Sequence, residues 1–296
     1  MLVCHCRFCD TRFNTIYSAA AGSNFVTTTF LFWNMGNQPR ADVAVQLVQQ
    51  HAVDVLMLTE CDIDDNHLTQ QLAVSTGVQF HRPWSQSTRI RIFTRMPQNQ
   101  VREVQFDPSN RMTISRLIFA KTDILLAVLH LPSKVNWSDE DQREEVQRYA
   151  REIRSAERRH GHERTVLVGD LNMNPFEPGM VSSHGFHGVM TRQLAMKKTR
   201  TVQNHDYPFF YNPMWGCYGD RTDGPAGSHF FRSGKPILYF WNIFDQVLVR
   251  PDLLSVFDND VQIIDSVGTD SLCDNLGRPD SSKGSDHFPL LFRLGL

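Results

Sequence analysis

Carboxylate and carboxamide side chains follow an apolar run in the segment Val166-Leu-Val-Gly-Asp170-Leu-Asn172. The run has the composition of a buried strand, and the two polar groups at its end are two residues apart. Groups at a strand end can point together into a cleft, where they can move protons or bind a cation. Asp and Asn also favour turns, so this segment alone is equally consistent with a turn.

Five other segments place groups of the same chemical types at the end or the start of an apolar strand. They are Phe30-Leu-Phe-Trp-Asn34, Val55-Leu-Met-Leu-Thr-Glu60, Leu125 to Leu129 followed by His130, Phe244-Asp245-Gln-Val-Leu-Val249, and Gly284-Ser-Asp286-His287 before the last apolar run. Six such strand ends in one chain are difficult to explain as caps and solvated turns. We therefore interpret them as parts of one site, although His130 alone is also consistent with a histidine that caps a buried strand.

The elements that must position these groups can be read from hydrophobic periodicity. We expect a helix after Pro39, where Val43, Leu47 and Val48 repeat at helical spacing, and a long surface helix from Ser138, which forms a capping box with Asp141. Short successive strands in the first half favour antiparallel pairing, and residues 196–235 should form one or two long loops. The expected strands are Phe25 to Trp33, Val53 to Leu58, Arg89 to Thr94, Met112 to Phe119, Ile124 to His130, Thr165 to Gly169, Ile243 to Val249 and Phe288 to Leu294.

The start of the chain differs from the rest. Residues 1–24 lack periodicity and end in a small-residue run, so we expect a flexible N-terminal extension there. No internal repeat or low-complexity linker follows residue 24. Residues 25–296 are therefore predicted to form one catalytic domain with mixed strands and helices.

Three of the six cysteines lie within this extension, as Cys4, Cys6 and Cys9 beside His5. Their spacing is not that of a disulfide framework. They have the form of half a zinc site, but no second closely spaced Cys or His pair follows. A flexible leader without a metal is the alternative that we favour.

Composition restricts the class of partner. The formal charge of −2 provides no global basic field for DNA or an anionic membrane, so a polyanion must be met locally. The longest apolar runs are far shorter than the roughly 20 residues of a spanning helix, so no transmembrane segment is expected. No secretory signal is visible, and we expect a cytoplasmic protein.

The segments with Glu60, Gly169-Asp170-Leu-Asn172 and Ser285-Asp286-His287, in this order, resemble the endonuclease/exonuclease/phosphatase superfamily. Its members include pancreatic-type deoxyribonucleases, apurinic endonucleases, neutral sphingomyelinases and inositol polyphosphate 5-phosphatases. The similarity spans about residues 28 to 294. It implies an α/β fold, a four-layer α/β sandwich in which two mainly antiparallel β-sheets pack face to face and are flanked by helices, with the active cleft at one rim.

The resemblance also implies a metal site. Glu60 would be the principal ligand of a Mg²⁺ or Mn²⁺ ion, with Asn34 and Asp286 close by, which gives the oxygen ligands that a hard cation prefers. One departure from the pattern lies after Asn34, where Gly36 stands in place of the acidic residue that some apurinic endonucleases carry. This weakens assignment to that branch and any second ligand there.

The same resemblance assigns catalytic roles. Asn172 would bind a non-bridging phosphate oxygen, and Asp170 would activate or orient the attacking water. His287, held by Asp245, would contact the phosphate or take part in proton transfer. His130 would donate to a phosphate oxygen or assist the leaving group.

Cationic and aromatic side chains suggest where a substrate is held. Arg89 and Arg91 alternate along one predicted strand face, although arginines there are equally consistent with a solvated sheet surface. Lys197 and Lys198 precede Tyr211 and Trp215, and cations with aromatic rings can hold a nucleic acid strand by charge and stacking. Aromatic loops also insert into lipid interfaces, so this signal has two interpretations.

A nuclease that hydrolyses DNA or RNA is the function that we favour, because the expected protein has no anchor and no long apolar protrusion. The alternative in the same class is a phosphatase or phosphodiesterase that acts on a phosphoinositide, sphingomyelin or a small nucleotide. The alternative in another class is a catalytically silent binding module. The presence of Glu60, Asp170, Asn172, Asp286 and His287 argues against the silent module. The sequence does not identify a protein partner.

Overall fold

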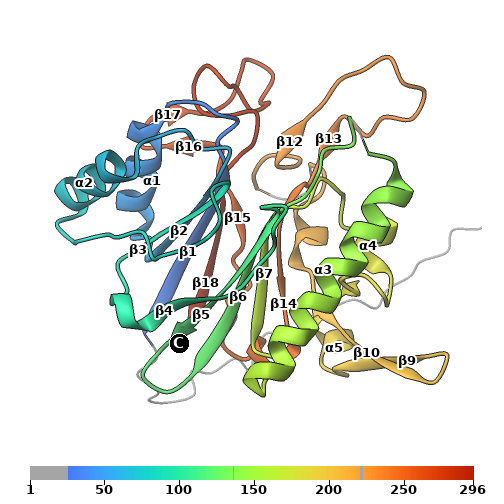
Figure 1. Cartoon of the computed structure of the whole chain (residues 1–296). Helices are drawn as coiled ribbons and strands as arrows, with labels where there is room; N and C mark the ends of the chain where they lie inside the picture. Colours follow the sequence, from blue (N-terminus) through green and yellow to red (C-terminus); the bar gives the residue numbers. More distant parts are fainter. Residues whose placement is uncertain (1–25, 136, 221–222) are drawn as a thin grey trace, which may run out of the picture.

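A computed structural model describes residues 26–135, 137–220 and 223–296 of the chain. The expected N-terminal extension, with Cys4, Cys6 and Cys9, lies outside the described residues. Two large β-sheets pack face to face, and helices cover the outer face of each sheet (Figure 1). The four-layer sandwich of the prediction is thereby confirmed.

The first sheet has five strands in the order β15-β18-β1-β2-β3. Helices α1 and α2 cover its outer face (Figure 1). The β1 and β2 strands are parallel, whereas the other neighbours are antiparallel. The elements are β1 (Thr27–Asn34), α1 (Ala41–His51), β2 (Val55–Thr59), α2 (Asp65–Thr76), β3 (Ile90–Thr94), β15 (Gln262–Ile263) and β18 (Leu290–Gly295).

The second sheet has seven strands in the order β4-β5-β6-β7-β14-β11-β8, and helix α3 packs along its outer face. The β6 and β7 strands are parallel, and β14 is antiparallel to β7. The elements are β4 (Val101–Phe106), β5 (Met112–Ile118), β6 (Asp123–His130), α3 (Asp139–His160), β7 (Thr165–Asp170), α4 (Pro178–Val181), β8 (Gly188–Val189), α5 (Arg192–Ala195), β11 (Phe210–Tyr211) and β14 (Asp245–Val249).

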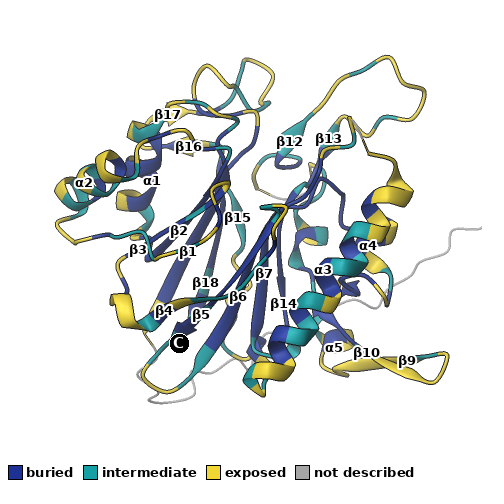
Figure 2. Ribbon diagram, viewed as in Figure 1, coloured by how far each residue is buried: buried dark blue, intermediate teal, exposed yellow. Residues whose placement is uncertain are grey.

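Strand β1 shows why the central strands have continuous apolar sequences. Phe30 and Phe32 point into the core between the two sheets, whereas Leu31 and Trp33 point into the core beneath α1 and α2. Successive side chains of a strand alternate between its faces, so a strand that is covered on both sides must be apolar throughout. The central strands are accordingly buried over most of their length (Figure 2).

Helix α3 begins and ends as its sequence indicates. The Ser138 hydroxyl accepts the backbone N–H of Asp141, and the Asp141 carboxylate accepts the backbone N–H of Ser138, which is the predicted capping box. Gly161 ends the helix with a φ of +72°. An apolar face formed by Val146, Tyr149, Ile153 and Ala156 is buried against the second sheet.

Residues 196–235 contain more regular structure than the expected long loops. They include a hairpin, β9 (Thr199–Val202) and β10 (His205–Pro208), whose turn residues Gln203 and Asn204 have φ values of +49° and +64°. Two adjacent residues with positive φ are typical of a tight hairpin turn, and Asn is favoured there. The 3₁₀ helix η2 (Pro213–Cys217), strand β11 and strand β12 (His229–Phe230) follow, so the loop prediction was wrong.

The remaining described elements are short. They are η1 (Gln98–Gln100), β13 (Trp241–Asn242), η3 (Pro251–Leu253), β16 (Ser266–Val267) and β17 (Asp270–Ser271). Within the described ranges, no helix combines the length and the apolar character that crossing a bilayer requires.

Asp123, the first residue of β6, forms ion pairs with two arginines at the far end of the second sheet. It accepts hydrogen bonds from Arg116 Nε at 2.6 Å and from Arg164 Nη2. Burial alone raises the pKa of Asp123, but these two hydrogen bonds outweigh it and lower the pKa from 3.8 to about 2. A carboxylate with a lowered pKa stabilises the fold above its unfolded pKa and loses this contribution as the pH falls through its folded pKa.

We therefore expect Asp123→Asn to lower the free energy of unfolding at pH 7 by about 1 kcal/mol, since solvent screens part of the interaction. The difference from the wild type should shrink as the pH falls from 3.8 towards 2. Urea unfolding at pH 7 and pH 3 measures this. Asp270→Asn, at an exposed position with no ion pair in the described part of the chain, is the control. An equal loss at both pH values would contradict the assignment.

Candidate active site

Two pairs of parallel strands bring polar side chains to one edge of the molecule. Asn34 ends β1 and pairs with Thr59 of β2, so Glu60 lies directly beyond that strand. His130 ends β6 and pairs with Asp170, which ends β7. Parallel strands end at the same edge of their sheet, and the two sheets are packed so that their edges meet.

Antiparallel strands contribute two further groups to this edge. Asp245 begins β14 and pairs with Asp170. Strand β18 is antiparallel to β1, so Asp286 and His287, which precede it, lie beside Asn34. The structure therefore brings the predicted catalytic and metal-binding residues to one edge.

Two of these residues have a backbone conformation that side chains disfavour. Glu60 has a φ of +46° and Asn172 a φ of +48°. Left-handed backbone is uncommon for Glu and is therefore strained at Glu60, whereas Asn adopts it more readily. Residues with such strain cluster at functional sites. Glu60 follows β2 directly and lines the pocket beside the site, whereas the Asn172 amide donates to the Leu131 carbonyl.

Asp170 lies at the centre of the site and is 2% exposed. Its Oδ2 accepts a hydrogen bond from Asn34 Nδ2, and its Oδ1 accepts the backbone N–H of Asn172, both at 2.9 Å. The same Oδ2 is 3.8 Å from His130 Nε2 and 4.0 Å from His287 Nε2. One carboxylate oxygen therefore faces two imidazoles and a carboxamide.

His287 forms a buried pair with Asp245. Its Nδ1 is 2.8 Å from Asp245 Oδ2, and its backbone carbonyl accepts Trp33 Nε1 at 2.9 Å. Burial alone lowers the pKa of His287, but the negative charges of Asp245 and Asp170 outweigh it and raise the pKa to about 10. His287 is therefore a cation at neutral pH, with Nε2 directed towards Asp170.

His130 lies between Glu60 and Asp170. Its Nε2 is 3.2 Å from Glu60 Oε1, while its Nδ1 is buried and has no hydrogen-bond partner in the described residues. The hydrogen bond from His130 lowers the pKa of Glu60 more than burial raises it. Glu60 is thus held as a carboxylate whose side chain is still 36% exposed.

Asp286 projects from the edge next to Gly36. The Ser285 hydroxyl is bonded to the Asn34 carbonyl at 2.8 Å and lies 3.2 Å from Asp286 Oδ1. Gly36 has a φ of +53°, and a Cβ there would lie 2.6 Å from Asp286 Oδ1. The position where the sequence lacks an acidic residue is therefore one at which a side chain would displace Asp286.

We expect Gly36→Ala to weaken divalent-ion binding about 10-fold, because the added methyl group moves the Asp286 carboxylate. Gly77→Ala is the matched control, since Gly77 has a similar φ of +71° but open space around its Cβ position. Both variants should lose about 1 kcal/mol of stability from the backbone strain. Calorimetric Mn²⁺ titration and urea unfolding separate the two effects. Equal Mn²⁺ affinity in the two variants would contradict the role of Asp286.

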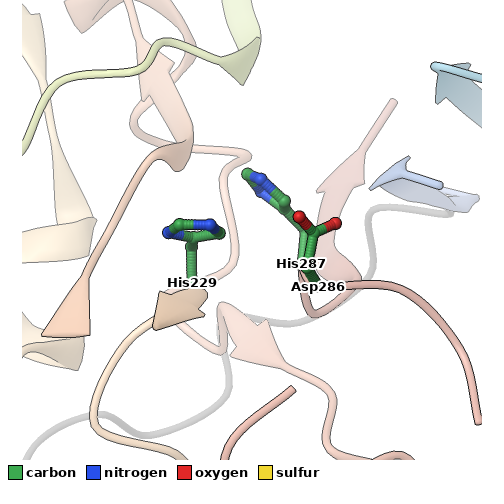
Figure 3. Close-up of side chains that lie close together, drawn as sticks. All are labelled: His229, Asp286 and His287. Carbon is green, nitrogen blue, oxygen red and sulfur yellow. The ribbon is translucent and has the colours of Figure 1, made fainter. Parts of the chain in front are cut away.

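Two groups of side chains in the described residues could hold a cation, each with its ligand atoms within 4.8 Å of one another. One is Asp170, Asp245 and His287, and the other is His229, Asp286 and His287 (Figure 3). Glu60 belongs to neither group. The Asn34 amide presents its nitrogen to Asp170 and its oxygen to the Gly36 N–H. The carboxylates of Glu60 and Asp286, together with this amide oxygen, are a donor set that suits a hard divalent cation.

A pocket of about 440 Å³ opens beside Glu60 and His130. Arg89, Arg91 and Arg111 line it. Arg91 is committed to an ion pair with Asp65, 3.1 Å away, whereas neither Arg89 nor Arg111 has an ion pair within the described ranges. The cleft therefore has a basic wall beside its acidic centre.

Other predicted substrate-binding residues lie elsewhere. Lys198 pairs with Asp252 at 2.7 Å, beyond the end of β14 that is opposite the site, and Lys197 is its exposed neighbour. Tyr211 pairs with Val249 at that same far end. The structure does not bring these three residues to the site.

Trp215 lies nearer to the site. Its ring meets Phe176 edge-on, with centroids 6.2 Å apart, and Tyr218 and Tyr239 meet the same phenylalanine at 5.9 Å and 5.3 Å. Phe176 follows the loop after β7, in which Asn174 bonds to the backbone of Ile243. An aromatic cluster thus borders the strand ends that carry Asp170 and Asp245.

Three residues at the cleft were not among the predicted site residues. Arg111 donates to the His130 carbonyl at 3.4 Å, Trp137 lines the pocket, and His229 lies beside His287 with ring centroids 4.5 Å apart. Burial lowers the pKa of His229 to about 4. A sequence signal existed for His229, which follows Gly227-Ser228 at the start of an aromatic strand, as His287 follows Gly284-Ser285-Asp286.

A family model described as Endonuclease/Exonuclease/phosphatase family matches residues 31–287. The chain belongs to this family. The resemblance that the strand-end motifs indicated is thereby confirmed.

Solved structures share the fold at low identity. A humanized D. rerio TDP2 with 14 mutations is 13% identical, with a TM-score of 0.53, over 91% of this chain and 99% of that chain. An AP endonuclease from Archaeoglobus fulgidus is 12% identical, with a TM-score of 0.52, over 91% and 100%. An endonuclease/exonuclease/phosphatase family protein from Leptotrichia buccalis is 13% identical, with a TM-score of 0.52, over 91% of this chain and 100% of that chain. The search of curated proteins found no significant match.

Proposed function

We propose that the chain is a divalent-metal-dependent phosphodiesterase, and specifically a nuclease that hydrolyses DNA or RNA. The observation that carries the proposal is the arrangement around Asp170, where one carboxylate oxygen faces Asn34, His130 and His287 within 4.0 Å. Attack of water on a phosphodiester needs a group that orients the water and cations that neutralise the growing charge.

Glu60, Asp286 and the side-chain amide oxygen of Asn34 would hold a Mg²⁺ or Mn²⁺ ion. Such an ion, when bound, neutralises negative charge on the phosphate oxygens. Glu60 suits this role because its lowered pKa keeps it ionised, and Asp286 because it is exposed at the rim. The residues present thus fit the cofactor that the resemblance implies.

The remaining residues act on the water and the phosphate. Asp170, fixed by two hydrogen bonds, orients the attacking water and accepts its proton. Protonated His287 donates from Nε2 to a phosphate oxygen, and Asp245 holds the proton on Nδ1. The Asn172 amide donates one N–H to the Leu131 carbonyl and has a second N–H for the phosphate.

The pocket beside the site supports a nucleic acid as the substrate. Arg89 and Arg111 lie where a neighbouring phosphate would pass, and Trp137, which is 37% exposed, offers a ring for stacking on a base. A D. rerio TDP2 of the same fold has been solved with a single-strand DNA product. Arg89 and Arg91 remain in the proposed binding surface, and Trp215 borders it.

One feature supports the lipid alternative. The loop between β12 and β13 projects from the molecule (Figure 1) and exposes Phe231, Ile237, Tyr239 and Phe240 by 43–80%. This differs from the expectation that the chain has no apolar protrusion long enough to enter a membrane. Exposed apolar side chains next to a phosphodiesterase site are suited to insertion between lipid headgroups.

A panel of substrates tests the proposal. Purified protein with Mg²⁺ or Mn²⁺ is incubated with single-stranded DNA, duplex DNA, RNA, bis-p-nitrophenyl phosphate, and vesicles that contain sphingomyelin or a phosphoinositide. EDTA and Asp170→Ala are the controls. We expect cleavage of a nucleic acid that both controls abolish. Turnover of lipids alone would replace the nuclease with the lipid alternative, and ion binding without turnover would favour the silent binding module.

A further inference from the structure

His229 is a half-buried histidine that the proposed reaction does not use. Its backbone forms a bridge with His287, and Phe288 N donates to the Ser228 carbonyl at 2.8 Å. The two histidines are therefore neighbours on adjacent chain segments and point to the same side, as Figure 3 shows. Their ring centroids are 4.5 Å apart, with a tilt of 41°.

The environment of His229 leaves a nitrogen unexplained. One face of the ring stacks on Phe244, with centroids 5.2 Å apart, which fixes its orientation. Its Nδ1 is buried and has no hydrogen-bond partner in the described part of the chain. Buried polar atoms are nearly always paired, so this nitrogen is free to bind a water molecule or an ion.

Asp286 stands opposite the two rings and supplies an oxygen. One ring nitrogen of each histidine and one Asp286 carboxylate oxygen lie within 4.8 Å of one another (Figure 3). Because Asp245 engages His287 Nδ1, Nε2 is the nitrogen of His287 that remains for a ligand. Asp170 Oδ2, 4.0 Å from that nitrogen, lies within reach as a further oxygen.

The charge of the cleft favours a cation here. Four carboxylates, those of Glu60, Asp170, Asp245 and Asp286, form no ion pair with any lysine or arginine among the described residues. The histidines cannot balance them. A divalent ion that replaces a proton on His287 would reduce this excess of negative charge.

We propose that His229, His287 and Asp286 form a second cation site in the cleft, which takes a transition-metal ion such as Zn²⁺ rather than Mg²⁺. Two imidazole nitrogens and a carboxylate are the donor set of zinc-type sites, whereas Mg²⁺ prefers oxygen. The site shares Asp286 with the proposed Mg²⁺ position, but two histidines take the place of Glu60 and Asn34. Because the ion would take His287 Nε2, it would compete with the proton that the proposed reaction uses. The inference rests on the proposed function only in treating this cleft as the active site. Binding of the ion itself requires no turnover.

Co²⁺ is the probe, because its visible spectrum reports nitrogen ligands and the coordination number. The titration uses the full-length chain in which Cys4, Cys6 and Cys9 are changed to serine, so that these thiols cannot supply the signal. We expect a Co²⁺ spectrum with nitrogen ligation that Zn²⁺ abolishes and a large excess of Mg²⁺ does not. His229→Gln should weaken Co²⁺ binding at this site by about 10- to 100-fold. His205→Gln, at an exposed position on the distant β10, is the matched control and should bind as the parent does.

Two further measurements separate the possible failures. Glu60→Gln should keep the Co²⁺ spectrum, because Glu60 is not one of the three ligands. Zn²⁺ titration of ¹⁵N-histidine-labelled parent protein, followed by NMR, should shift the ring nitrogens of His229 and His287 and needs no variant that must fold. Unchanged Co²⁺ binding in His229→Gln, or no shift of the His229 nitrogens, would overturn the second site. Failure of the chain to cleave phosphodiesters would leave this test unaffected.

Discussion

Asp170→Asn is expected to lower kcat for phosphodiester hydrolysis by at least about 10³-fold while the protein stays folded. The amide keeps the shape of the carboxylate, but it loses the negative charge and cannot accept a proton from water. Asp170 is also the group that faces both His130 and His287. Removal of its charge therefore leaves the attacking water without a proton acceptor. It also takes away the negative charge that faces the two imidazoles.

Asp252→Asn is the matched control for this variant. Asp252 is a paired aspartate at the opposite end of the same sheet, bonded to Lys198. It should leave kcat unchanged. Rates from initial velocities, with thermal unfolding of each variant, decide the outcome. Activity of Asp170→Asn within 10-fold of the wild type would remove Asp170 from the reaction.

Asp245→Asn is expected to lower kcat by about 10²- to 10³-fold and to change its pH dependence. Asp245 and Asp170 raise the pKa of His287 to about 10, so the wild-type imidazole stays protonated throughout the neutral range. Without the Asp245 charge the pKa of His287 falls towards its ordinary value of 6.5, and the proton is lost as the pH rises through neutrality. The variant should therefore be most impaired at alkaline pH and least impaired near pH 6.

A pH–rate profile of kcat from pH 5.5 to 9 measures this effect. Asn in place of Asp245 keeps the volume of the fully buried side chain, and thermal unfolding checks that the fold persists. If the ratio of variant to wild-type kcat is the same at every pH, Asp245 does not act through the charge of His287.

The positions of the central site residues could be predicted because strand geometry leaves little freedom. A covered strand is largely apolar, so the first charged or carboxamide residue marks its end, as Asn34, Glu60 and Asp170 do. Parallel pairing of β1 with β2 and of β6 with β7 then brings these ends to one edge. Local sequence also predicts helix α3, because its capping box involves only Ser138 and Asp141.

The substrate-binding surface could not be predicted as well, because it depends on the path of the chain between the strands. Lys198 and Trp215 are 17 positions apart, and a sequence gives no sign that they lie at opposite ends of the sheet. The β9–β10 hairpin and the antiparallel pairing of β11 with β14 decide this. The Lys198–Asp252 ion pair then holds the lysine away from the cleft.

His229 is a residue at the site that the sequence did not predict. It lies 58 positions before His287, and only the bridge between their backbones makes them neighbours. A histidine in an aromatic segment ordinarily has a structural role in packing, and the stacking of His229 on Phe244 is consistent with such a role. The unpaired Nδ1 is visible only once the fold has buried it.

The most direct test of the central claim is the rate of oligonucleotide cleavage as a function of Mg²⁺ concentration, for the wild type and for Glu60→Gln. Glu60 is the proposed principal ligand of the ion, and its variant keeps the size of the side chain. We predict a saturable dependence on Mg²⁺ in the wild type, loss of cleavage in EDTA, and at least a 10-fold higher Mg²⁺ requirement in the variant. Cleavage that persists in EDTA, or the same Mg²⁺ dependence in both proteins, would contradict a metal-dependent phosphodiesterase site at this edge.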